Sequence, residues 1–142
     1  MKQFIHLSFF VLLISSSFLV KAQVVDQKVH QVIFQVTKGE MKDQNKAIGQ
    51  LNNILKALPK AEIEVICHGN ALPMLLKTES QVKEGIADLQ QRGVIFAACE
   101  NTMKRAKVSK DDLIPGSITV PSGLAEIIIR QEQGWAYIKA GN

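Results

Sequence analysis

The chain alternates between two patterns of hydrophobic and polar residues after an apolar beginning. Five short runs are rich in β-branched and aromatic residues, and such runs predict strands. Between them, apolar residues recur three or four positions apart, which is typical of helices with one buried face. The strands are expected at 29–36, 63–67, 94–98, 117–120 and 135–138. This alternation predicts an α/β fold, a three-layer α/β/α domain with a five-stranded, mostly parallel sheet.

Local signals predict where the helices begin and end. Pro59 ends the first helix, since its ring cannot continue the hydrogen-bond ladder. Thr78 and Gln81 have the spacing of a capping box and are expected to open the second helix. The last helix begins near Ser122, and three of its apolar residues are expected to face the sheet: Leu124, Ile127 and Ile128.

Cys99 is the strongest candidate for chemistry. It follows a continuous apolar strand and precedes a short helix, and ligands gather outside the carboxyl ends of parallel strands. Unpaired N–H groups at the helix start favour an anion, and Arg105 follows within two turns. Such a setting lowers the pKa of a thiol and makes it nucleophilic. The alternative is that Cys99 only ends the apolar strand as a small buried residue.

Other polar residues also fall at the expected strand ends. His68 can serve as a base or charge partner to a thiolate, or simply hydrogen-bond a neighbouring loop. Asn101 lies at the same edge, beside Cys99. Cys67 fits a buried residue, and a disulfide with Cys99 is possible if their strands are neighbours. Ser122 and Gly123 can hold an anion at a helix start or form an ordinary N-cap.

The first residues have the pattern of a secretory signal peptide. Lys2 is followed by an apolar stretch over 4–20, and Ala22 ends a segment that suits signal peptidase. The expected products are a signal peptide, 1–22, and an exported domain, 23–142, with a periplasmic location favoured. Serines and a histidine within the apolar stretch argue against a membrane-spanning helix, so no membrane contact is expected after cleavage.

Composition narrows the function classes. The net charge is +4, and two of the lysines are lost with the signal peptide. The charges are spread along the chain without a basic run among aromatics, so no nucleic-acid partner is expected. The cysteines and histidines lack the paired spacing of metal ligands, and no phosphate loop or G-x-S-x-G motif occurs. Neither a metal nor another cofactor is expected, and metal-dependent hydrolysis is disfavoured.

Several motifs together resemble the DsrE/DsrF-like family. They are GVIFAACENTM at 93–103, the earlier His68-Gly69, VPSGLAEI at 120–127 and QEQGWAYI at 131–138. The resemblance extends over roughly 29–139. It implies a five-stranded sheet with helices on both faces and homo-oligomers, often trimers or hexamers. It also implies that the second and third strands are neighbours, which would bring Cys67 and Cys99 close enough for a disulfide.

The resemblance also implies a function. In the sulfur-relay members a cysteine ending the third strand carries a persulfide, and Cys99 matches its position. The sequence therefore favours a periplasmic sulfur carrier or redox protein acting through Cys99, with a protein sulfur donor or acceptor. Relay members work in the cytoplasm, however, and Cys67 is not part of their motif. The alternative is a non-catalytic oligomeric domain that binds a small anion or a protein partner.

Overall fold

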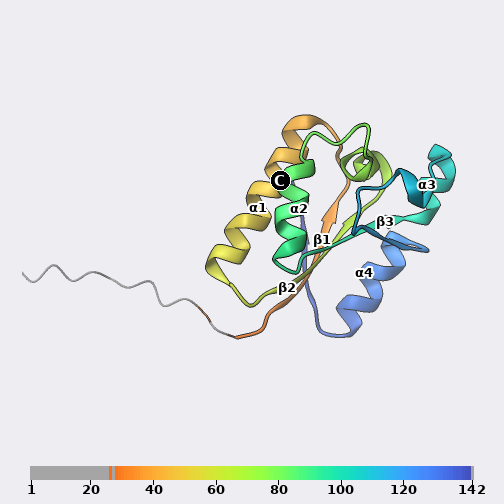
Figure 1. Cartoon of the computed structure of the whole chain (residues 1–142). Coiled ribbons are helices and arrows are strands. Elements are labelled where there is room, and N and C mark those ends of the chain that lie inside the picture. Colours follow the sequence, from red (N-terminus) through yellow and green to blue (C-terminus); the bar gives the residue numbers. More distant parts are fainter. Residues whose placement is uncertain (1–25, 27, 142) are drawn as a thin grey trace, which may run out of the picture.

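The computed structural model describes residues 26 and 28–141, and its strands form one sheet (Figure 1). The expected signal peptide lies outside the described residues. The strand order is β4-β3-β2-β1-β5, and all neighbouring strands are parallel. The expected α/β fold is confirmed, and the sheet is entirely parallel. The strands are β1 (Gln31–Val36), β2 (Glu62–Cys67), β3 (Ile95–Cys99), β4 (Ile118–Val120) and β5 (Ala136–Lys139).

Helices cover the two faces of the sheet unequally. Helices α1 (Met41–Ala57) and α2 (Lys83–Gln91) pack on one face, which we call the α1/α2 face (Figure 1). Helix α4 (Gly123–Glu132) lies on the other, the α4 face. A short helix, α3 (Glu100–Ala106), continues directly from β3, and two 3₁₀ helices, η1 (Gly69–Leu75) and η2 (Lys110–Asp112), occupy connections.

Side chains alternate between the two faces along each strand. In β1, Val32, Phe34 and Val36 enter the α1/α2 core, whereas Ile33 enters the α4 core. The α1/α2 core is the larger, and Phe34, Leu51 and Ile86 are completely buried within it. The α4 core consists of fewer residues: Ile33, Ile66, Ala97, Val120 and Ile127, with Trp135 packed against them.

The α4 face also contains a buried charge. Glu64 on β2 is completely buried, and its carboxylate lies 2.7 Å from Nε of Arg130 on α4. Arg130 also pairs with Glu126 at 2.8 Å and lies over the ring of Trp135. Burial raises the pKa of Glu64, Arg130 opposes this effect, and Glu126 adds to it. The ion pair therefore fastens α4 to the middle of the sheet.

Two expectations about the helices are wrong. Only Ile127 of the three apolar residues predicted to face the sheet is buried, while Leu124 and Ile128 are 58% and 56% exposed. Among the described residues, α4 is the one helix on its face, so no second helix packs beside it to bury them. The predicted capping box at Thr78 does not form, since α2 begins at Lys83 and the N–H of Gln81 donates to the Gln44 side chain.

None of the helices among the described residues is long and apolar enough to span a membrane.

Candidate functional site

Because side chains alternate between the two faces of each strand, one set of candidate site residues lies at the carboxyl edge of the α4 face. Cys99 ends β3 on the same face as Ala97, and His68 follows β2 two residues after Ile66. The first residue of α4 lies between these two strand ends. A Cβ added at Gly123 would lie 3.4 Å from Cβ of Cys99 and 3.5 Å from Cβ of His68. The ends of β2 and β3 and the start of α4 therefore converge.

This close approach suits a glycine at position 123. A Cβ at this position would lie only 2.8 Å from Cγ2 of Ile66, so the start of α4 or the Ile66 side chain would have to move. The close approach lets the Gly123 N–H donate a hydrogen bond to Sγ of Cys99 at 3.3 Å. The sequence left an anion site or an ordinary N-cap open at this helix start. Ser122 forms the N-cap and accepts from the Ala125 N–H, while the Gly123 N–H contacts the thiol.

The Cys99 thiol is surrounded by hydrogen-bond donors. Burial is the largest single influence on its pKa and would raise it. The N–H of Gly123, the N–H and hydroxyl of Thr102 and the N–H of Asn101 together outweigh burial and lower the pKa below that of an ordinary thiol. Cys99 is 6% exposed. The arrangement therefore favours the thiolate form of Cys99, with only a small part of the residue's surface exposed to solvent.

Thr102 connects this thiol to Arg105. Its hydroxyl accepts from the Gly69 N–H at 3.1 Å and from Nη2 of Arg105 at 3.5 Å. The Thr102 hydroxyl therefore lies between the Arg105 guanidinium and the Cys99 thiol. Sequence reasoning named Arg105 but missed Thr102, although its position three residues after Cys99 at a helix start was a usable signal. Cys99, His68, Thr102, Arg105 and Gly123 together are called the Cys99 site below.

Asn101 contributes to the site through its backbone rather than its side chain. Its N–H contributes to lowering the pKa of Cys99. Its side chain is exposed and has no hydrogen-bond partner among the described residues.

His68 is held by a chain of side chains that the sequence did not reveal. Gln35 on β1 donates from Nε2 to Nε2 of His68 at 2.7 Å, and the Tyr137 hydroxyl on β5 donates to the Gln35 carbonyl oxygen. With Nε2 accepting, the ring proton lies on Nδ1. Burial lowers the pKa of His68, and the charges of Lys139 and Arg105 lower it further. The ring is therefore neutral at pH 7 and suits a hydrogen-bond donor better than a positive partner for a thiolate.

Cys67 lies on the opposite face of the sheet. Strands β2 and β3 are neighbours, as the resemblance implied, but Cys67 is opposite Ala98 rather than Cys99. Cys67 and Ala98 belong to the α1/α2 core, whereas Cys99 faces α4. Of the states that the sequence left open, the disulfide is not formed, since both cysteines are free thiols in the structure. Complete burial raises the pKa of Cys67 to about 12, so this thiol stays protonated at neutral pH.

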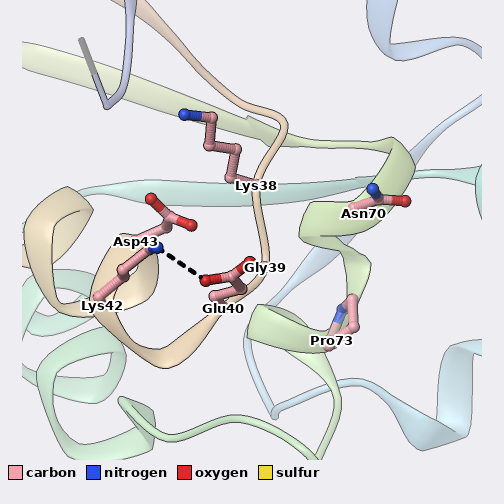
Figure 2. Close-up of a pocket in the computed structure, with 7 residues that line it drawn as sticks. All are labelled: Lys38, Gly39, Glu40, Lys42, Asp43, Asn70 and Pro73. Atoms are coloured by element: carbon pink, nitrogen blue, oxygen red, sulfur yellow. Dashed lines mark ion pairs between the residues drawn. The ribbon is translucent and has the colours of Figure 1, made fainter.

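A separate pocket lies where β1 leads into α1 (Figure 2). The chain can pass close to η1 here only because residue 39 is glycine, since a Cβ would lie 1.9 Å from the Asn70 carbonyl oxygen. An ion pair of 3.0 Å joins Lys42 to Glu40 across the helix start. No residue of the Cys99 site lines this pocket. The lining residues are Lys38, Gly39, Glu40, Lys42, Asp43, Asn70 and Pro73.

The fold and site define a class of protein: a three-layer α/β domain with a cysteine of lowered pKa at the end of its third parallel strand. Within the described part of the chain, no three His, Cys, Asp or Glu side chains lie together as metal ligands. The chain belongs to the DsrE/DsrF-like family, whose model matches residues 30–140. Membership implies a protein of the sulfur-relay type.

Two solved structures are similar to this chain. One is a protein of unknown function, MTH1491 from Methanobacterium thermoautotrophicum, which is 30% identical with a TM-score of 0.74. That match covers 78% of this chain and 98% of the other. The ychN protein from E. coli has a TM-score of 0.63 over 80% of this chain and 99% of its own, and its 11% identity supports the fold alone. No curated protein matches the chain.

Proposed function

We propose that the protein is a thiol-based sulfur carrier or redox protein that acts through Cys99. The observation that carries this proposal is the contrast in pKa between the two cysteines. Donors around Cys99 lower its pKa, whereas burial raises that of Cys67 to about 12. A thiolate attacks a sulfane sulfur or a disulfide, and the product is a persulfide or a mixed disulfide. Family membership supports the same chemistry.

The residues of the Cys99 site have distinct roles in this proposal. The N–H groups of Gly123, Asn101 and Thr102 stabilise negative charge on the Cys99 sulfur before transfer. Arg105 adds positive charge beside Thr102. His68 offers a neutral hydrogen-bond donor, oriented through Gln35.

Export and assembly are further parts of the proposal. The pattern of residues 1–22 supports secretion to the periplasm, where a protein donor or acceptor would meet the mature chain. The α4 face supports assembly into a trimer or hexamer, because it leaves large apolar side chains exposed. These side chains are Ile95, Ile118, Leu124, Ile128 and Tyr137. Sedimentation of the mature chain measures its assembly, and a monomer at all concentrations would contradict this part.

One observation favours a second function, a non-catalytic binding domain for a small anion or a protein partner. Cys99 is only 6% exposed, and a thiol that reagents cannot reach would serve packing alone. The two proposals differ in whether Cys99 reacts in the folded protein.

Mass spectrometry separates these functions. The mature protein is purified without reductant and its intact mass is measured before and after exposure to polysulfide. A carrier gains the mass of one sulfur atom, dithiothreitol removes it, and Cys99→Ser abolishes the gain. Cys67→Ala is the matched control and keeps the gain. A folded wild-type protein that gains no sulfur would favour the binding domain.

A further inference from the structure

Two cations, Arg105 within the Cys99 site and Lys139 at its edge, have no acidic partner among the described residues. Lys139 is opposite Gln35 in the β1–β5 register, and both Lys139 and Arg105 act on the His68 ring. Their side chains are exposed, and neither forms an ion pair with any described carboxylate. Unpaired cations from separate elements, converging on one edge, are free to attract a ligand of opposite charge.

The nearest carboxylate in the sequence is turned away from this edge. Glu100 follows Cys99 directly, but its carboxylate accepts a hydrogen bond from the Thr119 hydroxyl at 2.7 Å. Thr119 is opposite Ala98 on β3, and Ala98 belongs to the α1/α2 core. No carboxylate of the described part of the chain is among the groups that shift the pKa of Cys99 or His68. The approach to the thiol is therefore positively charged.

A positive approach matters most for one kind of sulfur donor. A thiolate and an anionic donor repel each other, and nearby cations offset this repulsion. A neutral disulfide needs no such help. The limited exposure of Cys99 also favours a small donor. We propose that the Cys99 site receives sulfur from a small dianionic sulfane donor of the thiosulfate class, selected by Lys139 and Arg105. This inference rests on the proposed carrier function.

The transfer needs no additional oxidant. The Cys99 thiolate attacks the outer, sulfane sulfur of thiosulfate and forms a new sulfur–sulfur bond. The bond between the two thiosulfate sulfurs breaks, and sulfite leaves with its electron pair. Cys99 becomes an anionic persulfide, so the total charge is unchanged. The backbone N–H groups around Cys99 stabilise the thiolate from which this transfer begins.

The test compares two reagents on the mature protein. Thiosulfate is the dianionic donor, and 2-hydroxyethyl disulfide is a neutral probe that also requires the Cys99 thiolate. Intact mass gives the rate of each reaction. The ratio of the thiosulfate rate to the rate with the neutral probe cancels the effect of any change in the thiol pKa. Arg105→Gln and Lys139→Gln are each expected to lower the ratio about fivefold, and the double variant further. Added salt should lower the wild-type ratio as well.

Matched variants remove the same charge elsewhere. Lys104→Gln changes the neighbouring residue on α3, and Lys56→Gln changes the last turn of α1; both should keep the ratio within about twofold. A double variant with an unchanged ratio would overturn the selection by these cations, as would a wild-type protein that reacts with the neutral probe but not with thiosulfate. In both results the carrier function stands. A wild-type Cys99 that reacts with neither reagent would overturn both proposals.

Discussion

The two faces of the sheet use the same strands for different purposes. The α1/α2 face is covered by two helices and packs a large apolar core, in which Cys67 is an inert buried thiol. The α4 face has one helix, a smaller core, a buried ion pair and the Cys99 site. Cys67 and Cys99 end neighbouring strands, yet burial raises the pKa of Cys67 whereas hydrogen-bond donors lower that of Cys99. The larger apolar core and the candidate chemistry thus lie on opposite faces of the sheet.

The largest expected effect is on the α1/α2 core. Leu51→Ala removes a completely buried side chain and should lower the free energy of unfolding by about 4 kcal/mol. Leu124→Ala on the α4 face removes a side chain that is 58% exposed and should change it by less than about 0.5 kcal/mol in the monomer. Urea denaturation of both variants measures the difference, and equal losses would contradict the division between faces.

The next effect concerns the buried charge on the α4 face. Arg130→Met leaves the Glu64 carboxylate buried without its partner, and should cost about 3 kcal/mol of stability near pH 7. Arg92→Met breaks an exposed pair with Asp88 and should cost no more than about 1 kcal/mol. Denaturation of the two variants gives this comparison. If both cost the same, the Glu64–Arg130 pair does not fasten α4.

A pH-dependent effect separates the two cysteines. The folded pKa of Cys67 is raised to about 12, so above roughly pH 9 only the unfolded chain ionises this thiol. Cys67 therefore destabilises the fold increasingly as pH rises above roughly 9, by about 1.4 kcal/mol per pH unit up to the folded pKa. Cys67→Ala removes this contribution.

The stability difference between wild type and Cys67→Ala should accordingly shift in favour of the variant from pH 8 to pH 10. Denaturation at both pH values measures the shift. The lowered pKa of Cys99 has the opposite sign, because its contribution to stability is lost as pH falls through the folded pKa. A constant difference between wild type and Cys67→Ala would mean that Cys67 is not buried as described.

The smallest effect concerns the position of α4. Gly123→Ala places a Cβ 2.8 Å from Ile66, so the start of α4 or the Ile66 side chain must move, and a shift of α4 weakens its N–H···Sγ hydrogen bond. The pKa of Cys99 should rise, and alkylation at pH 7 should slow several-fold. Gly49→Ala is the matched control, because nothing lies within 4 Å of the added Cβ on α1. Equal alkylation rates in both variants would remove Gly123 from the site.

The sequence was enough to predict the fold because its main signals are local. Apolar runs and helical spacing depend on nearby residues, and they located all five strands and the position of Cys99 at a strand end. The Gln35–Tyr137 contact joins residues 102 positions apart and depends on the β1–β5 register. The role of Lys139 depends on the same register. No local pattern contains this information, so both were missed.

The wrong predictions have physical reasons of the same kind. Helical spacing shows that Leu124 and Ile128 share a side of α4 with Ile127, but not how much of that side the sheet covers. Thr78 and Gln81 match a capping box, but the Gln81 N–H finds a better-placed acceptor in the Gln44 side chain. The possible Cys67–Cys99 disulfide was inferred only from which strands are neighbours. Alternation of side chains along the strands places the two thiols on opposite faces of the sheet.

The most direct measurement is alkylation of the two cysteines in the folded protein as a function of pH, with peptide mapping to distinguish them. Cys99 should react with a midpoint below the pKa of an ordinary thiol, while Cys67 should remain unmodified until the protein unfolds. If Cys99 also stays unmodified until unfolding, or reacts with the midpoint of an ordinary thiol, the α4 face does not hold an activated thiol.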